Sequence, residues 1–196
     1  MSKSVVAWIA ITALASLIAS LDGGHLAQWT ALAPSRVWHG ELWRLATWPL
    51  IERTLYSTTL SCLILARYAG PLAARWGGVA LARFVAPIVV LAAIATCLVA
   101  LVSHHANEPR LGGWAITAIL MIAWGRQFPD WTLVPTGGLF RLRGASLVLG
   151  IVGLTIVLAL LVGPLSCVPE LAACAIAIWW PLPRQSSESR SESAPL

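Results

Sequence analysis

Hydroxyl side chains cluster in one apolar part of the sequence, and a serine among them is the first candidate for a nucleophile. The cluster comprises Ser57, Thr58, Thr59 and Ser61. A serine nucleophile needs a general base within hydrogen-bond reach, and no His stands at a suitable position beside this stretch. Hydrogen bonding between helices explains these hydroxyl groups more simply.

Two glutamates, Glu52 and Glu170, lie near the ends of apolar segments and are candidates for acid–base chemistry. An acid within a membrane is costly unless it is paired. Arg53 or Arg44 is a suitable partner for Glu52. We therefore expect a structural ion pair rather than an acid catalyst.

The histidines and cysteines raise the question of a metal or pigment site. His104 and His105 are adjacent, so their side chains point to different sides of a helix and make a poor metal pair. His25 and His39 are expected on the same side of the membrane, and solvated histidines are the simpler interpretation. We expect no metal site and no cofactor. The four cysteines show no CxxC spacing, and we expect them to be small, buried, apolar side chains. They are Cys62, Cys97, Cys167 and Cys174.

The composition indicates what must position these residues. Hydrophobic residues make up 58% of the 196-residue chain and charged residues only 11%, whereas a soluble domain carries about 25% charged residues. The chain is therefore predicted to be a polytopic membrane protein. Its net charge of +5 is explained by Arg in the loops that flank membrane helices. We therefore expect acidic lipid headgroups to be the partner of this charge, and we expect no binding of nucleic acid.

Six segments are candidate membrane helices, because a spanning helix needs about 20 mostly apolar residues. They are approximately Val5–Leu21, 50–67, 80–102, 112–125, 145–162 and 167–180. The fourth and sixth are short, which suits helices sheltered inside a bundle. We therefore expect an all-α membrane bundle of six transmembrane helices.

The loop charges predict the orientation of this bundle. With the N-terminus inside, nine Lys and Arg residues fall on the cytoplasmic side and four on the other, so both termini are expected in the cytoplasm. Residues 1–182 are predicted to form one membrane domain. Residues 183–196 have almost no apolar side chains to bury and are predicted to be a disordered tail.

The first external loop, approximately 22–49, is long and rich in Trp. It contains Trp29, Trp38, Trp43 and Trp48. Trp prefers the membrane interface, where its ring is half buried and its N–H stays hydrated. We expect this loop to lie in the headgroup layer, with Trp43 at the interface and Arg44 snorkelling toward water.

Several motifs resemble the rhomboid family of intramembrane proteases. The stretch 40–50 contains Glu41, then Leu-Trp-Arg, then a Thr three residues on, which is similar to the rhomboid loop motif. Residues 69–78 resemble the family's link between its second and third helices. Gly112 resembles the start of its fourth helix. The resemblance covers about Val5–Pro181 and implies a six-helix rhomboid-like fold, in which Trp43 and Arg44 anchor a lateral loop.

The catalytic residues of rhomboids are absent at every matching position. The resemblance places Trp114 at the serine nucleophile and Glu170 at the histidine base. It places Glu52, Ser57 and Ser61 where rhomboids carry two His and an Asn, of which the Asn and one His help to stabilise the oxyanion. This alignment predicts that Glu52, Trp114 and Glu170 converge near the former active site, with Trp114 filling the cavity.

Scaffold motifs without catalytic residues predict a non-proteolytic rhomboid-like protein, a pseudoprotease. We expect it to bind other transmembrane proteins, either transiently or as an accessory subunit of a larger membrane complex. The alternative is a divergent intramembrane serine hydrolase that uses Ser57 or Ser61 with Glu170. The expected location is the bacterial inner membrane.

Overall fold

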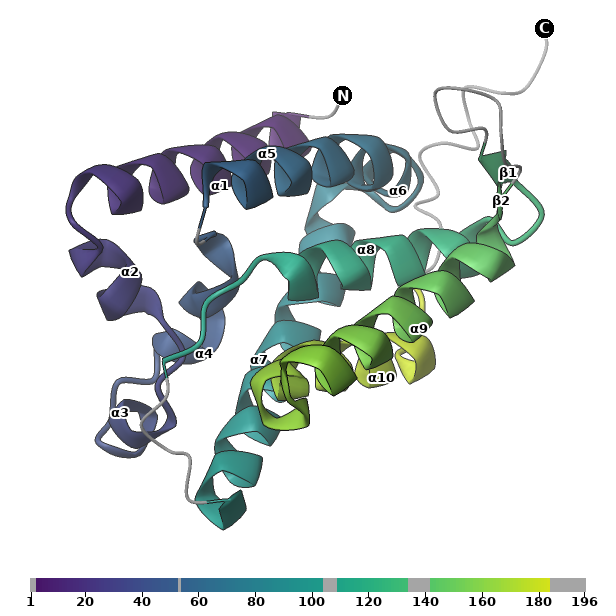
Figure 1. The fold of residues 1–196 in the computed structure, drawn as a ribbon. Coiled ribbons are helices and arrows are strands. Elements are labelled where there is room, and N and C mark those ends of the chain that lie inside the picture. Colours follow the sequence, from purple (N-terminus) through teal and green to yellow (C-terminus); the bar gives the residue numbers. More distant parts are fainter. Residues whose placement is uncertain (1–2, 53, 104–108, 134–141, 184–196) are drawn as a thin grey trace, which may run out of the picture.

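The computed structural model describes residues 3–52, 54–103, 109–133 and 142–183 (Figure 1). Its three long helices are α1 (Lys3–Leu21), α7 (Gly78–Ser103) and α9 (Gly144–Val162). By length and composition these three can cross a membrane, which agrees with the predicted membrane protein. The total of six spans stays a prediction, and the predicted disordered tail lies outside the described residues except for Pro183.

The second predicted span, 50–67, is interrupted in the structure. Its first residue ends the 3-10 helix η1 (Trp48–Leu50), and the regular helix α5 covers only Leu55–Ile64 before a π-helix, η2 (Leu65–Ala69), and α6 (Gly70–Trp76). A capping box at the N-terminus of α5 explains why this helix starts late. Two hydroxyl side chains satisfy backbone N–H groups there, which starts the helix five residues later than expected.

The short helix α8 (Trp114–Gln127) lies at the centre of the fold. Its side chains from Ala115 to Gly125 are all buried, with α9 packed on it and α10 (Val168–Trp179) packed against both α8 and α7. The expectation that the fourth segment is sheltered is therefore confirmed. The other short helix, α10, follows the 3-10 helix η3 (Pro164–Cys167) and buries only one face.

A pair of glycines permits the close approach of α8 and α9. A Cβ on Gly125 would lie 2.5 Å from the Gly144 carbonyl oxygen and 2.7 Å from a Val148 methyl group. Small residues of this kind let helix backbones pack closely in membranes. In the chain between α8 and α9, the two-residue strands β1 (Thr132–Leu133) and β2 (Leu142–Arg143) pair antiparallel. They form the sheet in the described residues.

The loop formed by residues 22–49 is folded into short helices. It contains α2 (His25–Thr30), α3 (Pro34–Trp38) and α4 (Arg44–Thr47), followed by η1. Figure 1 shows these helices beside α7, below the end of α1. Trp48 has no exposed surface and joins the hydrophobic core. The expectation of a half-buried interfacial Trp is therefore wrong at this position, because the ring packs inward.

Candidate functional site

The buried guanidinium of Arg44 organises the loop 22–49. Its Nη1 donates hydrogen bonds to the carbonyl oxygens of Gln28 and Ala31, each at 2.7 Å, and its Nε donates to Glu41 Oε2 at 2.6 Å. The side chain is completely buried, whereas that of Glu41 is 29% exposed. The predicted snorkelling of Arg44 is therefore wrong, since the guanidinium satisfies the C-terminal carbonyl groups of α2.

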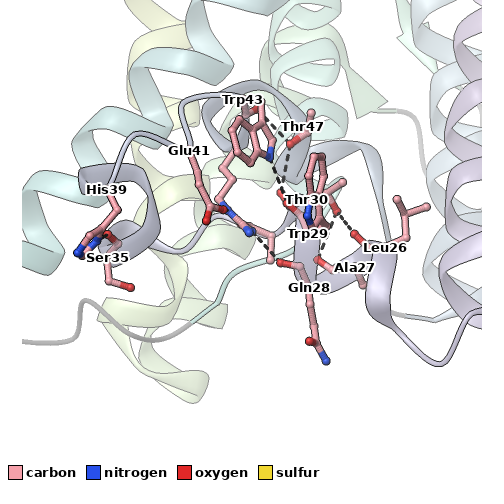
Figure 2. A network of polar contacts seen from close by, with 12 residues as sticks. Leu26, Ala27, Gln28, Trp29, Thr30, Ser35, His39, Glu41, Trp43 and Thr47 are labelled. Carbon is pink, nitrogen blue, oxygen red and sulfur yellow. Dashed lines mark hydrogen bonds and ion pairs between the residues drawn. The ribbon is translucent and has the colours of Figure 1, made fainter.

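Trp29 and Trp43 lie next to each other in the same network of polar contacts as Glu41 (Figure 2). The rings of Trp29 and Trp43 stack with their centroids 5.0 Å apart, and Trp43 Nε1 donates to the Trp29 carbonyl oxygen at 3.4 Å. The Thr47 hydroxyl donates to the Thr30 carbonyl oxygen at 3.3 Å. Together these contacts join α4 to α2, and the role of Trp43 and Arg44 as an anchor at the membrane surface stays a prediction.

The organised loop in turn positions the glycine segment that precedes α8. Leu32 and Arg110 exchange backbone hydrogen bonds of 2.8 and 2.9 Å, and the Gly112 N–H points to the Trp48 carbonyl oxygen at 3.5 Å. Gly112 has φ +154°. The loop and the start of α8 are thus joined by main-chain contacts, so a disturbance of one reaches the other.

Two carboxylates approach this glycine segment. A Cβ on Gly113 would clash with Glu52 Oε1 and would lie 3.2 Å from Glu52 Cδ. A Cβ on Gly112 would lie 3.9 Å from Glu170 Oε1. The predicted convergence of Glu52, Trp114 and Glu170 at the start of α8 therefore agrees with the structure.

The carboxylate of Glu52 is held by a serine rather than by an arginine. Ser61 Oγ donates to Glu52 Oε1 at 2.5 Å, and Ser16 Oγ accepts from the Glu52 N–H at 3.1 Å. Glu52 is only 8% exposed. The expected pairing with Arg44 is wrong, because that guanidinium binds Glu41, and Arg53 lies outside the described residues.

Ser57 does not take part in this site. Its hydroxyl donates to the Thr54 carbonyl oxygen at 2.8 Å and accepts from the Thr54 N–H, while its own N–H donates to Thr54 Oγ1. These are the bonds of the capping box of α5. Ser57 therefore has a local structural role at a helix end.

Glu170 and Trp114 line a cavity of about 190 Å³ between α8, α9 and η3. Its remaining lining residues are Thr155, Leu158, Val162 and Cys167. A second cavity of about 340 Å³ shares Val162, Cys167 and Glu170 and reaches Arg110, whose guanidinium donates to the Leu165 carbonyl oxygen. Trp114 thus forms a wall of an open cavity. The expectation that Trp114 fills the former active-site pocket stays a prediction, and a cavity lies beside its ring.

The described histidines lie away from these cavities. His25 and His39 are exposed in the loop 22–49, and His39 Nδ1 lies 2.7 Å from the Ser35 carbonyl oxygen. His104 and His105 lie outside the described residues. Among the residues that the structure describes, no three His, Cys, Asp or Glu side chains form a group that could hold a metal ion.

A comparison with known protein families covers almost the whole chain. The model of a family described as eukaryotic integral membrane protein (DUF1751) matches residues 3–184. The chain belongs to the DUF1751 family. The family description agrees with the predicted integral membrane protein, and since it names eukaryotic proteins it gives no support to a bacterial inner membrane. No curated protein matches the chain.

One residue of this DUF1751 site was missed by sequence reasoning. Ser16 lies on α1 and is buried against the Glu52 backbone. Thr12, Ser16 and Ser20 recur every four residues in α1, so they share one helix face. That periodic hydroxyl stripe is the sequence signal for a polar contact with a neighbouring segment.

Proposed function

We propose that this DUF1751 member is a non-proteolytic, rhomboid-like membrane protein that binds other transmembrane proteins, as an accessory subunit of a larger membrane complex. The observation that carries the proposal is the open cavity at the start of α8, walled by Trp114 and Glu170. A cavity that persists beside a non-nucleophilic residue is suited to binding. The six-span arrangement with both termini in the cytoplasm is part of this proposal and rests on the rhomboid resemblance and the loop charges.

The chemistry at the start of α8 argues against proteolysis. A serine protease needs a nucleophile with an adjacent base and donors that stabilise an oxyanion. Trp114 supplies no hydroxyl group, and the sequence contains no His after His105. The Glu52 carboxylate beside Gly113 would repel a developing negative charge when ionised. These residues support binding without cleavage.

The cavity is accessible from an apolar helix surface. Leu158 and Val162 of α9 line it, and Leu154 and Leu161, on the same helix face as Leu158, are exposed. Figure 1 shows α9 at the outer side of α8. Transmembrane helices associate through close packing and hydrogen bonds across the interface. A partner helix that packs along α9 would contact both the apolar surface and the polar end of the cavity.

A single observation favours a second candidate, a divergent intramembrane serine hydrolase. The 2.5 Å hydrogen bond between Ser61 and Glu52 places a carboxylate in contact with a hydroxyl. A fluorophosphonate probe tests it: covalent labelling of Ser61 that is lost in Ser61→Ala would support the hydrolase. The geometry changes one part of that alternative, because the carboxylate bonded to Ser61 is Glu52 and Ser57 is engaged at the helix cap.

Purification from native membrane in a mild detergent tests the proposed binding. We expect the wild type to elute in a complex of fixed stoichiometry with a transmembrane protein. Leu158→Trp should release that partner by filling the cavity. Leu160→Trp is the matched control, because Leu160 lies on the same helix with 77% of its surface exposed and should leave the complex intact. Elution of the wild type as a monomer would contradict the proposal.

A further inference from the structure

An apolar groove separates α1 from α7 on a different side of the molecule. Two adjoining cavities of about 450 and 210 Å³ form it and share Trp8, Leu50 and Ala82 as lining residues. One cavity reaches Ser4 and Gly78 and the other extends to Val90. The groove therefore runs from the first turns of both helices along about three turns of α7.

The two helices start in contact and then diverge. A Cβ on Gly78 would clash with the Ser4 side chain, so α1 and α7 touch at their N-terminal ends. Figure 1 shows them separating from that point, with α4 in the angle between them. Pro49 and Leu50 close the inner end of the groove. The result is an apolar wedge between the two helices.

Two cations border the narrow end of the wedge. Lys3 lies one turn before Ala7, which lines the groove, and Arg83 lies one turn before Ala86, which also lines it. Residues three or four apart share a helix face, so both cations border the groove. Both are exposed, and neither α1 nor α7 contains an acidic residue.

We infer that this groove binds one anionic phospholipid, with an acyl chain along α7 and the headgroup between Lys3 and Arg83. The apolar lining matches the chain, and the two cations match a headgroup phosphate. Basic pockets between membrane helices recognise anionic headgroups in this way. The site does not depend on the proposed partner at α9, because it lies between other helices.

Native mass spectrometry of the purified full-length chain tests the inference. The protein is incubated with equal amounts of phosphatidylglycerol and phosphatidylcholine of the same chain length. The wild type should retain phosphatidylglycerol preferentially. Each cation near a membrane surface contributes about 1 kcal/mol to anionic lipid binding, so the Lys3→Gln/Arg83→Gln double variant should lower that preference by roughly 10- to 30-fold. Both side chains are exposed, so the fold is expected to survive.

Two further variants separate the chain from the headgroup. Ala82→Phe places a ring where the two cavities join and should lower retention of both lipids. Ala145→Phe, at an exposed position on α9, is its control, and Arg36→Gln/Arg143→Gln, also exposed, is the control for charge. Equal retention of both lipids by the wild type, or equal losses in variants and controls, would overturn the inference. Displacement of the lipid by inorganic phosphate would overturn the role of the groove.

Discussion

Replacing Arg44 by Ala should destabilise the protein more than any other single change in the loop 22–49. The guanidinium donates to two main-chain carbonyl oxygens of the α2 region and to Glu41. Removing it leaves the Gln28 and Ala31 carbonyl groups without these donors. The same change loosens the contact between the loop and the start of α8, where Leu32 pairs with Arg110.

The size of this effect follows from the individual bonds. A hydrogen bond to a charged group contributes about 1.5–3 kcal/mol net, and Arg44 makes two such bonds of 2.7 Å to the backbone. The bond to Glu41 adds little, because water reaches that partially exposed carboxylate. The expected loss in the free energy of unfolding is therefore about 3–5 kcal/mol. Arg44→Lys should lose part of this, since an ammonium group lacks the planar fork of donors.

Denaturant unfolding in mild detergent, combined with hydrogen exchange over residues 25–50, measures this loss. Arg36→Ala is the matched control, because the Arg36 side chain is exposed on α3 and its removal should change stability by less than about 0.5 kcal/mol. Amide protection in the loop should fall in Arg44→Ala alone. Equal stability of the two variants would refute the assignment of Arg44 as the organiser of the loop.

Three other substitutions probe the start of α8. Gly113→Ala should lower the free energy of unfolding by about 1–3 kcal/mol, because its Cβ would clash with Glu52 and lie 3.3 Å from the Pro49 carbonyl oxygen. Gly150 has open space around it, so Gly150→Ala should be neutral when both variants are compared by denaturant unfolding. Ser61→Ala should lower the free energy of unfolding by about 1–3 kcal/mol, because it leaves the buried Glu52 carboxylate without its donor. The control Thr59→Ala removes only a hydrogen bond within an exposed helix turn. An equal effect of both variants would argue against the Glu52 contact. Trp114→Ser should cleave no transmembrane substrate in a liposome assay, because the base is missing as well, and measurable cleavage would show that the former active site is placed incorrectly.

Helix positions followed well from the sequence where the length of an apolar run decides them. The spans were predicted at 5–21, 80–102 and 145–162. Their ends lie within two residues of the ends of α1, α7 and α9. Local hydrogen bonding decides the places where the prediction failed. The Thr54–Ser57 capping box delays α5, and a polar side chain that satisfies nearby backbone groups competes with any hydropathy pattern.

The position of the candidate site was predictable from the sequence, but the partners of its charged groups were not. The rhomboid resemblance placed Glu52, Trp114 and Glu170 near one another, and the contacts around Gly112 and Gly113 agree. The partner of each charged group depends on three-dimensional distance, which spacing does not give. Sequence proximity pointed to an arginine for Glu52, whereas the fold brings Ser61 and Ser16 to it.

Site-specific photo-crosslinking from Leu158 in native membrane is the most direct test of the central claim. Leu158 lines the cavity beside Trp114 and Glu170, and Leu160, on the same helix and largely exposed, is the reference position. We expect a crosslink to a transmembrane protein from Leu158 and none from Leu160. Identical products from both positions, or lipid adducts alone from Leu158, would contradict it.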